Sequence, residues 1–187
     1  MQHQRISIKQ AAEYLKDGKV LAYPTEAVYG LGCDPLNEQA VKRILALKSR
    51  DISAGLILIS DRFERFESFH NAVTENQLEL ALNSWPGPVT WLFPRNESVP
   101  DYLAGHHSTI ALRVTGHETS RSLCQAFGGA IVSTSANPHG AEPARSAQRV
   151  FEYFGNEIDG IVDGPLGKET RPSEIRHLSS GETIRKA

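Results

Sequence analysis

The sequence of 187 residues has few of the features that mark secreted or membrane-bound proteins. It has only two cysteines, Cys33 and Cys124, and their separation fits no Cys-x-x-Cys metal or redox unit. No apolar run approaches the ~20 residues of a membrane-spanning helix, and the first residues have no apolar signal core. These absences favour a reduced cytoplasmic protein in which both cysteines are small core residues.

The chain also has little net charge, since 20 Lys and Arg residues stand against 22 Asp and Glu residues. Proteins that bind nucleic acid along their whole surface are usually basic, so this balance disfavours that class. A local cluster of cations would still bind a polyanion. The position of each cation is therefore more informative than the total.

The standard phosphate-binding and catalytic motifs are absent. Gly167-Lys168-Glu169 lacks the first glycine and the Ser or Thr of a P-loop, and the stretch 30–35 has proline where a dinucleotide fingerprint needs glycine. The adjacent His106 and His107 lack the i, i+4 spacing with which two histidines share a metal, so no metal site is predicted. Ser135 is outside a Gly-x-Ser-x-Gly elbow and has no evident histidine partner, which disfavours a hydrolase triad.

What the sequence does contain is an alternation of amphipathic helices and apolar strands. Capping residues at Ser7, Asn37 and Thr74 predict the starts of three helices. Further helices are expected over 118–127 and 146–154, and strands over 20–24, 56–59, 89–94, 110–114 and 131–134. With 40% apolar residues and no linker or repeat, this order predicts one α/β domain over residues 1–187, a twisted mixed sheet flanked by helices. The tail from residue 160 onward alternates too weakly to place strands.

The residues around Pro24 form the expected floor of a ligand site. Pro24 ends main-chain donation, so Thr25 and Glu26 should project from the end of a strand. Gly30 and Gly32 are expected to form the turn that follows. An ordinary strand-to-helix connection with Thr25 as a cap would give the same pattern, so this stretch alone does not distinguish a ligand site from a structural connection.

Cations and hydroxyl groups gather near the predicted ends of other elements. Lys48 and Arg50 follow a predicted helix, and Ser135 and Asn137 follow a predicted strand. Together they resemble a phosphate site built without a P-loop. Lys48 and Arg50 by themselves would also fit an ordinary solvated helix end. Arg113 lies inside a predicted strand, where burial without an anion would cost several kcal/mol, so it should meet either a structural carboxylate or a ligand's carboxylate or phosphate.

Six short motifs stand in one order along nearly the whole chain. They are Tyr23-Pro24-Thr25-Glu26 with Tyr29-Gly30-Leu31-Gly32-Cys33, Lys48-Ser49-Arg50, Trp85-Pro86-Gly87-Pro88-Val89-Thr90, Ala111-Leu112-Arg113-Val114, Ser133-Thr134-Ser135-Ala136-Asn137 and Pro172-Ser173-Glu174-Ile175. Each motif alone is weak, but in this combination the sequence resembles the YrdC/TsaC family of threonylcarbamoyl-AMP synthases in its short bacterial form. The resemblance implies a YrdC-like domain.

The resemblance implies a reaction as well. L-threonine, bicarbonate or CO2, and ATP with Mg2+ would give L-threonylcarbamoyl-AMP and diphosphate. The product would serve the formation of N6-threonylcarbamoyladenosine (t6A) at tRNA position 37. The resemblance also implies transfer of the product to the TsaD, TsaB and TsaE proteins and an association with tRNA or double-stranded RNA.

The resemblance further implies roles for ten residues. A Lys-x-Arg and Ser-x-Asn tetrad would act in catalysis and bind the ATP phosphates: Lys48, Arg50, Ser135 and Asn137. Two further nucleotide contacts are implied at Thr109 and Arg185, and four threonine contacts at Thr25, Arg113, Ser133 and Ser173. The physical chemistry agrees, because attack of a carbamate oxygen on the α-phosphate needs alignment and charge neutralisation rather than a protein nucleophile.

The sequence departs from the family pattern in two places. Gly55-Leu56-Ile57 stands where many relatives have a histidine, so a threonine contact by histidine does not transfer. Pro138-His139-Gly140 and Pro143 stand where relatives often have Ser-Gly and a further serine. Arg145 is a candidate phosphate contact in their place, and an ordinary surface arginine is the alternative.

Two other functions fit the same sequence. One is an RNA-binding module with a concave basic surface that acts in tRNA or rRNA maturation, although interleaved exposed aromatics and a basic net charge are missing. The other is a carbamoyl-transferring or maturation enzyme that uses the same fold on a different acyl-adenylate. Diphosphate release that requires both threonine and bicarbonate would distinguish the synthase.

Overall fold

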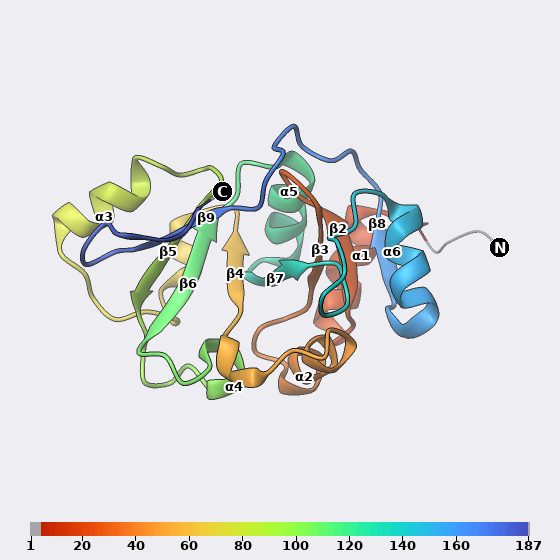
Figure 1. The fold of residues 1–187 in the computed structure, drawn as a ribbon, viewed down its shortest axis with the longest axis horizontal. Helices are drawn as coiled ribbons and strands as arrows, with labels where there is room; N and C mark the ends of the chain where they lie inside the picture. The colour runs from red at the N-terminus through yellow and green to blue at the C-terminus, as the bar shows by residue number, and fades with distance from the viewer. Residues whose placement is uncertain (1–4, 187) are drawn as a thin grey trace.

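The computed structural model describes residues 5–186, whose strands form a mixed sheet flanked by helices (Figure 1). The strands of this part of the chain are β1 (Arg5–Ile6), β2 (Leu21–Pro24), β3 (Tyr29–Gly32), β4 (Ile57–Ser60), β5 (Val89–Pro94), β6 (Thr109–Val114), β7 (Ile131–Ser135), β8 (Gly160–Val162), β9 (Glu174–His177) and β10 (Thr183–Arg185). Across the sheet they follow the order β1-β8-β2-β3-β7-β4-β6-β5-β9-β10. Because β4 and β6 pair in parallel and β2 and β3 antiparallel, the predicted α/β class with a mixed sheet is confirmed.

The three helices for which the sequence predicts capping residues, at Ser7, Asn37 and Thr74, begin directly after those residues. The helices of the described chain are α1 (Ile8–Lys16), α2 (Glu38–Leu47), α3 (Glu75–Leu82), α4 (Asp101–Ala104), α5 (Glu118–Phe127) and α6 (Ala147–Phe154), with short 3-10 helices at Ile52–Ala54, Phe63–Phe66 and Gly155–Glu157. Ser7 and Thr74 form the predicted capping boxes, and the Asn37 side chain accepts a hydrogen bond from the Ala40 amide. Within residues 5–186, no helix combines the length and apolar character needed to cross a membrane.

Two apolar cores form because neighbouring strand residues point to opposite faces of the sheet. In β2, Leu21 and Tyr23 belong to the core shared with α1 and α5, whereas Ala22 belongs to the core on the other face. Ile131 and Val132 divide in the same way in β7. The unbroken apolar runs in the sequence therefore reflect strands that are buried on both faces.

The weakly patterned tail supplies three strands that the sequence did not place. β8 lies between β1 and β2 and is parallel to both. β9 pairs in parallel with β5, with Ile175 opposite Thr90, and β10 pairs antiparallel with β9. Residues 163–173, which we call the strap, lead from β8 to β9, and Figure 1 shows this blue segment crossing one end of the sheet. The strap thereby brings the tail to the opposite half of the sheet.

Gly30 and Gly32 do not form a turn, so that prediction is wrong. Both lie in β3, and the turn is made by residues 25–28. A Cβ atom on Gly32 would stand 2.5 Å from the Val132 carbonyl oxygen and 2.6 Å from Cε1 of Tyr23. The Tyr23 ring crosses the strand at this point, and its hydroxyl donates to the Val132 carbonyl at 3.0 Å. Glycine is needed here for the close approach of a ring and a neighbouring strand, and not for backbone turning.

We expect Gly32→Ala to lower the free energy of unfolding by about 1–3 kcal/mol, because the added methyl group overpacks a fully buried site. Urea unfolding of the two proteins measures the difference. Gly116→Ala is the matched control, since a Cβ there meets its nearest atoms only at 3.7 Å. Equal losses in both variants would contradict the close-approach explanation.

Candidate active site

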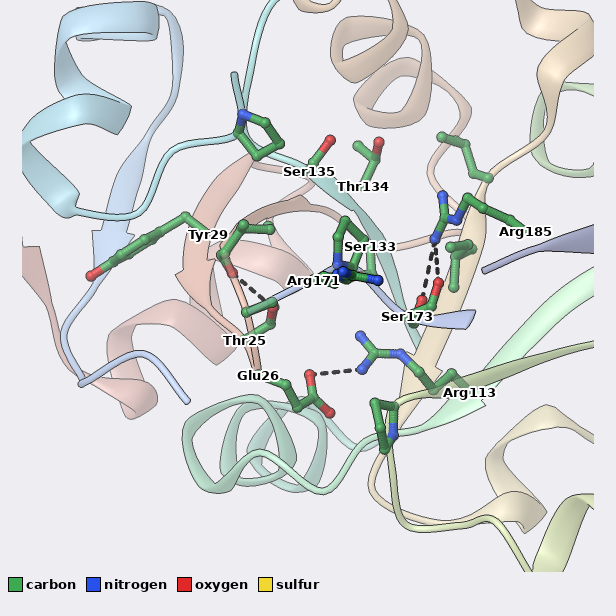
Figure 2. A pocket seen from close by; sticks show the side chains of 18 of the residues that line it. Thr25, Glu26, Tyr29, Arg113, Ser133, Thr134, Ser135, Arg171, Ser173 and Arg185 are labelled. Carbon is green, nitrogen blue, oxygen red and sulfur yellow. Dashed lines mark hydrogen bonds and ion pairs between the residues drawn. The ribbon is translucent and has the colours of Figure 1, made fainter. Parts of the chain in front are cut away.

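A cavity opens where the strap, the β2–β3 turn and strands β6 and β7 meet, and Figure 2 shows the side chains around it. Seven of the predicted site residues line it: Thr25, Arg50, Arg113, Ser133, Ser135, Ser173 and Arg185. Among the described residues of its wall, four are arginines, namely Arg50, Arg113, Arg171 and Arg185, and one is a carboxylate, Glu26. This excess of positive charge suits an anionic ligand.

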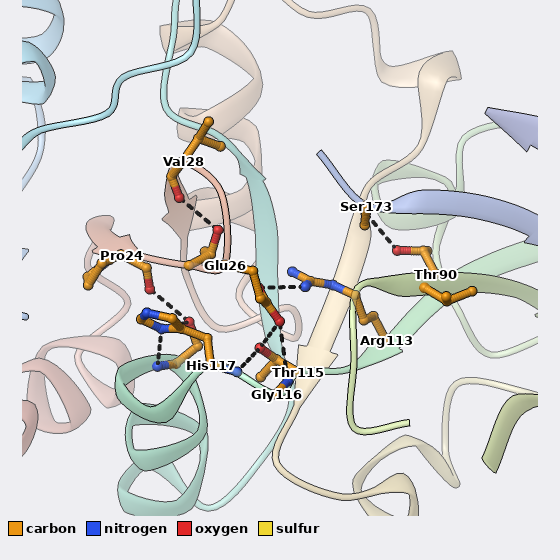
Figure 3. A network of polar contacts seen from close by, with 12 residues as sticks. Pro24, Glu26, Val28, Thr90, Arg113, Thr115, Gly116, His117 and Ser173 are labelled. Atoms are coloured by element: carbon orange, nitrogen blue, oxygen red, sulfur yellow. Dashed lines mark hydrogen bonds and ion pairs between the residues drawn. The ribbon is translucent and has the colours of Figure 1, made fainter. Parts of the chain in front are cut away.

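The centre of the cavity wall is a buried ion pair between Arg113 and Glu26 (Figure 3). Arg113 Nη1 lies 2.7 Å from Glu26 Oε2, and the two side chains are 7% and 13% exposed. Glu26 Oε1 also accepts hydrogen bonds from the Thr115 hydroxyl at 2.7 Å and the Gly116 amide at 3.2 Å. Burial would raise the pKa of Glu26, but the charge of Arg113 and the bond from Thr115 hold it below its ordinary value.

The ion pair answers the alternative that the sequence left open for Arg113. It meets a structural carboxylate, and it also lines the cavity. Its Nε is buried without a hydrogen-bond partner among the described residues. A guanidinium has five N–H donors, so Arg113 retains the capacity to bind a carboxylate in the cavity.

Thr25 and Ser133 form the floor on the two sides of β3. The Thr25 hydroxyl donates to the Val28 carbonyl at 2.7 Å and thus closes the turn between β2 and β3. Ser133 lies within β7 and is 7% exposed. The strap covers this floor, because the Gly167 amide donates to the Thr25 carbonyl at 2.9 Å.

The structure brings the Lys-x-Arg and Ser-x-Asn pairs together, but only half of the tetrad faces the cavity. Lys48 Nζ donates to the backbone carbonyls of Ser135 at 2.5 Å and Asn137 at 2.8 Å. The side-chain Nδ2 of Asn137 donates to the carbonyls of Pro138 and Ala141. Lys48 therefore holds the backbone of the turn that presents the Ser135 hydroxyl, and its contact with phosphate stays a prediction.

Burial gives Lys48 an unusual acid–base property. The residue is 5% exposed, and its ammonium group has lost most of its hydration. This desolvation, together with the nearby charge of Arg50, lowers the pKa of Lys48 from 10.5 to about 8. The alternative of a solvated helix end is thus wrong for Lys48.

Arg185 reaches the cavity from β10 and contacts another predicted site residue. Its Nη2 donates to the Ser173 carbonyl at 2.7 Å and to the Ser173 hydroxyl at 3.4 Å (Figure 2). Burial lowers the pKa of Arg185, and the charges of Arg113 and Arg50 lower it further. Arg185 is therefore repelled by two guanidinium groups from distant parts of the chain that line the same cavity.

A second, more apolar cavity adjoins the first and contains Thr109. Its wall includes the apolar side chains Leu92, Ala111, Ile175 and Ile184. Arg50 and Arg185 line both cavities, so they stand between the two. Thr109 does not line the first cavity, and the predicted nucleotide contacts are divided between two adjoining spaces.

Arg145, a candidate phosphate contact in the sequence, instead contacts backbone carbonyls of the strap and the β2–β3 turn. Its Nη2 donates to the carbonyls of Ala27, Glu169 and Thr170 at 3.3, 3.4 and 3.0 Å. It thus ties the strap to the β2–β3 turn and lies outside the wall of the first cavity. Residues 5–186 contain no group of three or more His, Cys, Asp or Glu side chains arranged to hold a metal ion.

Sequence reasoning missed two contributors to the wall. Glu26 was expected to project from the strand end, but its role as the partner of Arg113 has no local signal. Arg171 lies in the strap, where the sequence placed no element. Its position just before the Pro172-Ser173 motif was the one available sign.

This chain is similar to known proteins over nearly its whole length. Residues 13–187 match the family model Sua5/YciO/YrdC, which is described as telomere recombination. A threonylcarbamoyl-AMP synthase of Cellvibrio japonicus is 46% identical over 178 residues, which are 95% of this chain and 94% of that protein. A threonylcarbamoyl-AMP synthase of Pseudomonas savastanoi pv. phaseolicola is 48% identical over 178 residues, 95% of this chain and 96% of that protein.

Solved structures share the fold. Sua5 of P. abyssi complexed with L-threonine matches with a TM-score of 0.89 and 33% identity over 98% of this chain and 56% of the Sua5 chain. The present chain therefore spans a little over half of Sua5. E. coli YciO matches with a TM-score of 0.82 and 24% identity over 99% of this chain and 97% of its own, which shows the fold alone.

The pKa of Lys48 predicts a pH dependence of stability. It is about 8 in the folded chain against an ordinary value of 10.5, so between these pH values the unfolded state binds more protons. The free energy of unfolding of the wild type, relative to Lys48→Met, should therefore rise as pH increases through this window. Urea unfolding of both proteins at about pH 7, 9 and 10.5 measures this difference. A difference that stays constant with pH would show that the Lys48 ammonium is not desolvated.

Proposed function

Because this chain belongs to the Sua5/YciO/YrdC family, we propose that it is a threonylcarbamoyl-AMP synthase. The reaction joins L-threonine, bicarbonate or CO2, and ATP to give L-threonylcarbamoyl-AMP and diphosphate. The observation that carries the proposal is the pair of adjoining cavities that share Arg50 and Arg185. One cavity is polar and cationic, and the other is apolar, as a small anionic amino acid derivative and a nucleoside would require.

In this proposal the first cavity binds threonine. Arg113 binds the carboxylate with the donors that its ion pair to Glu26 leaves over, since a planar guanidinium matches a planar carboxylate. Hydroxyl groups surround this point: Thr25, Ser133 and Ser173. Threonine binding by the related P. abyssi Sua5 supports this assignment.

The nucleotide occupies the second cavity and the boundary between the two. The apolar wall and Thr109 receive the nucleoside, while Arg50 and Arg185 face the phosphates. The Ser135 hydroxyl lies on the threonine side of this boundary, on the turn that Lys48 holds. Lys48 contributes positive charge to the phosphate region and fixes the Ser135 to Asn137 backbone.

This arrangement suits an attack of the threonine carbamate oxygen on the α-phosphate with departure of diphosphate. The nucleophile belongs to the substrate, so the protein must align two ligands and neutralise phosphate charge. The arginines between the cavities lie where both ligands would meet. The residues present do not fit a resident magnesium site, because Glu26 is engaged by Arg113, Thr115 and Gly116. Mg2+ is therefore assigned to the substrate, as MgATP.

The proposal extends to the fate of the product. The family resemblance supports use of the product for t6A in tRNA, with transfer to the TsaD, TsaB and TsaE proteins and contact with tRNA. Both cysteines are free and buried, which supports a cytoplasmic setting where ATP is available.

Diphosphate release should depend on all three substrates. With MgATP and bicarbonate present, we expect omission of L-threonine to reduce the release to background, because no carbamate nucleophile forms. A coupled diphosphate assay measures the rate, and mass spectrometry of the product identifies the adenylate. Equal ATP consumption without threonine would refute the synthase. RNA binding without any diphosphate release would instead support the RNA-binding module.

Arg113→Lys should raise the KM for threonine by roughly 10- to 150-fold, since loss of a charge-assisted hydrogen bond costs about 1.5–3 kcal/mol. Affinity for ATP, measured by calorimetry, should change little. Arg43→Lys is the matched control, because Arg43 pairs with Asp159 at 2.6 Å and lines neither cavity. An unchanged KM for threonine in folded Arg113→Lys would leave Arg113 with a structural role only.

A further inference from the structure

The Trp85-Pro86-Gly87-Pro88-Val89-Thr90 motif contains a hydroxyl group that the proposed reaction has not used. Thr90 lies in β5 and is fully buried. Its Oγ1 is 3.0 Å from the Ser173 hydroxyl oxygen at the end of the strap (Figure 3). The same motif fixes the neighbouring backbone, because the Glu174 amide donates to the Pro88 carbonyl at 3.1 Å. The motif therefore holds both the main chain and the side chain at Ser173.

The partners of Ser173 determine the direction of its hydroxyl proton. Arg185 Nη2 lies 3.4 Å from Ser173 Oγ, and a guanidinium group can only donate, so Ser173 Oγ accepts this bond. The bond between Thr90 and Ser173 could run in either direction. If Ser173 donated, the proton of the buried Thr90 hydroxyl would have no acceptor among the described residues, which is costly. Thr90 is therefore the donor.

With Thr90 and Arg185 both donating to it, the Ser173 oxygen has used its acceptor capacity. Its own proton must then point away from both partners. Ser173 lines the first cavity, so the remaining direction leads into this cavity. Figure 2 shows Ser173 and Arg113 on the same side of this cavity.

We propose that Thr90 is a positioning residue that makes Ser173 a hydrogen-bond donor to the carboxylate of the amino acid substrate. The proposal rests on the proposed function, because it assumes that the first cavity binds threonine. A carboxylate accepts hydrogen bonds and does not donate them, so a Ser173 hydroxyl that pointed its oxygen at the ligand would repel it. Thr90 thus acts through Ser173 and does not touch the substrate.

Thr90→Val tests the proposal, because valine keeps the shape of threonine and removes the donor. We expect the KM for threonine to rise about 5- to 10-fold, the range for one directed hydrogen bond, with the KM for ATP unchanged. Thr90→Ser restores the hydroxyl and should return the KM for threonine to within about twofold of the wild type. Steady-state kinetics with each substrate varied in turn supplies both constants.

A second background shows whether Thr90 acts through Ser173. In Ser173→Ala the acceptor is gone, so adding Thr90→Val should change the KM for threonine no further. The matched control is Ser120→Ala, which removes a buried hydroxyl that donates to the Pro24 carbonyl at 2.8 Å and lines neither cavity. This control should leave the KM for threonine unchanged.

Three results would overturn the proposal: an unchanged KM for threonine in Thr90→Val, an equal rise in both KM values, or the same rise in the Ser173→Ala background. If circular dichroism shows that Thr90→Val does not fold, Thr90→Cys replaces it, since a thiol keeps the volume and is a weak donor. A wild-type protein that releases no diphosphate with threonine would instead refute the proposed function.

Discussion

The ion pair between Arg113 and Glu26 is the constraint around which the cavity is built. A cation inside a central strand loses its hydration, and an unpaired charge there would cost several kcal/mol. Its partner carboxylate, Glu26, lies just beyond the end of β2, so that end must approach β6 closely. The approach fixes the β2–β3 turn, and Thr115 and Gly116 complete the environment of the carboxylate. Satisfying one buried charge thus brings the walls of the first cavity together.

The strap depends on the same corner of the molecule. Its Gly167 and Glu169 amides donate to the carbonyls of Thr25 and Glu26, and Arg145 binds its later carbonyls. A Cβ atom on Gly167 would stand 2.5 Å from the Glu26 carbonyl oxygen, so the strap lies directly on the turn. The strap therefore links the position of Ser173, its last residue, to the position of Glu26 in the turn that Gly167 and Glu169 contact.

The parts of the fold that the sequence predicted are those with local causes. The capping boxes at Ser7 and Thr74 and the apolar runs of the central strands depend on neighbours within a few residues. Gly32 was misjudged because its reason, the Tyr23 ring, lies on another strand. In the site, the resemblance named the residues but gave no directions for their side chains. That Lys48 points at backbone carbonyls and Arg113 at Glu26 depends on tertiary contacts, which no local pattern records.

Arg50 and Arg185 line both cavities, and this shared wall has a thermodynamic consequence for the affinities of the two proposed ligands. Burial lowers the pKa of Arg185, and the charges of Arg113 and Arg50 lower it further, so part of this shift is repulsion among the cations of the cavity wall. In the proposed function, anionic phosphates in one cavity would relieve that repulsion, and the carboxylate of an amino acid in the other would relieve part of the same repulsion. The two proposed ligands would then be attracted by the same cations, so whichever binds first would weaken the electrostatic attraction of the site for the second. Linkage requires this antagonism to be equal in both directions.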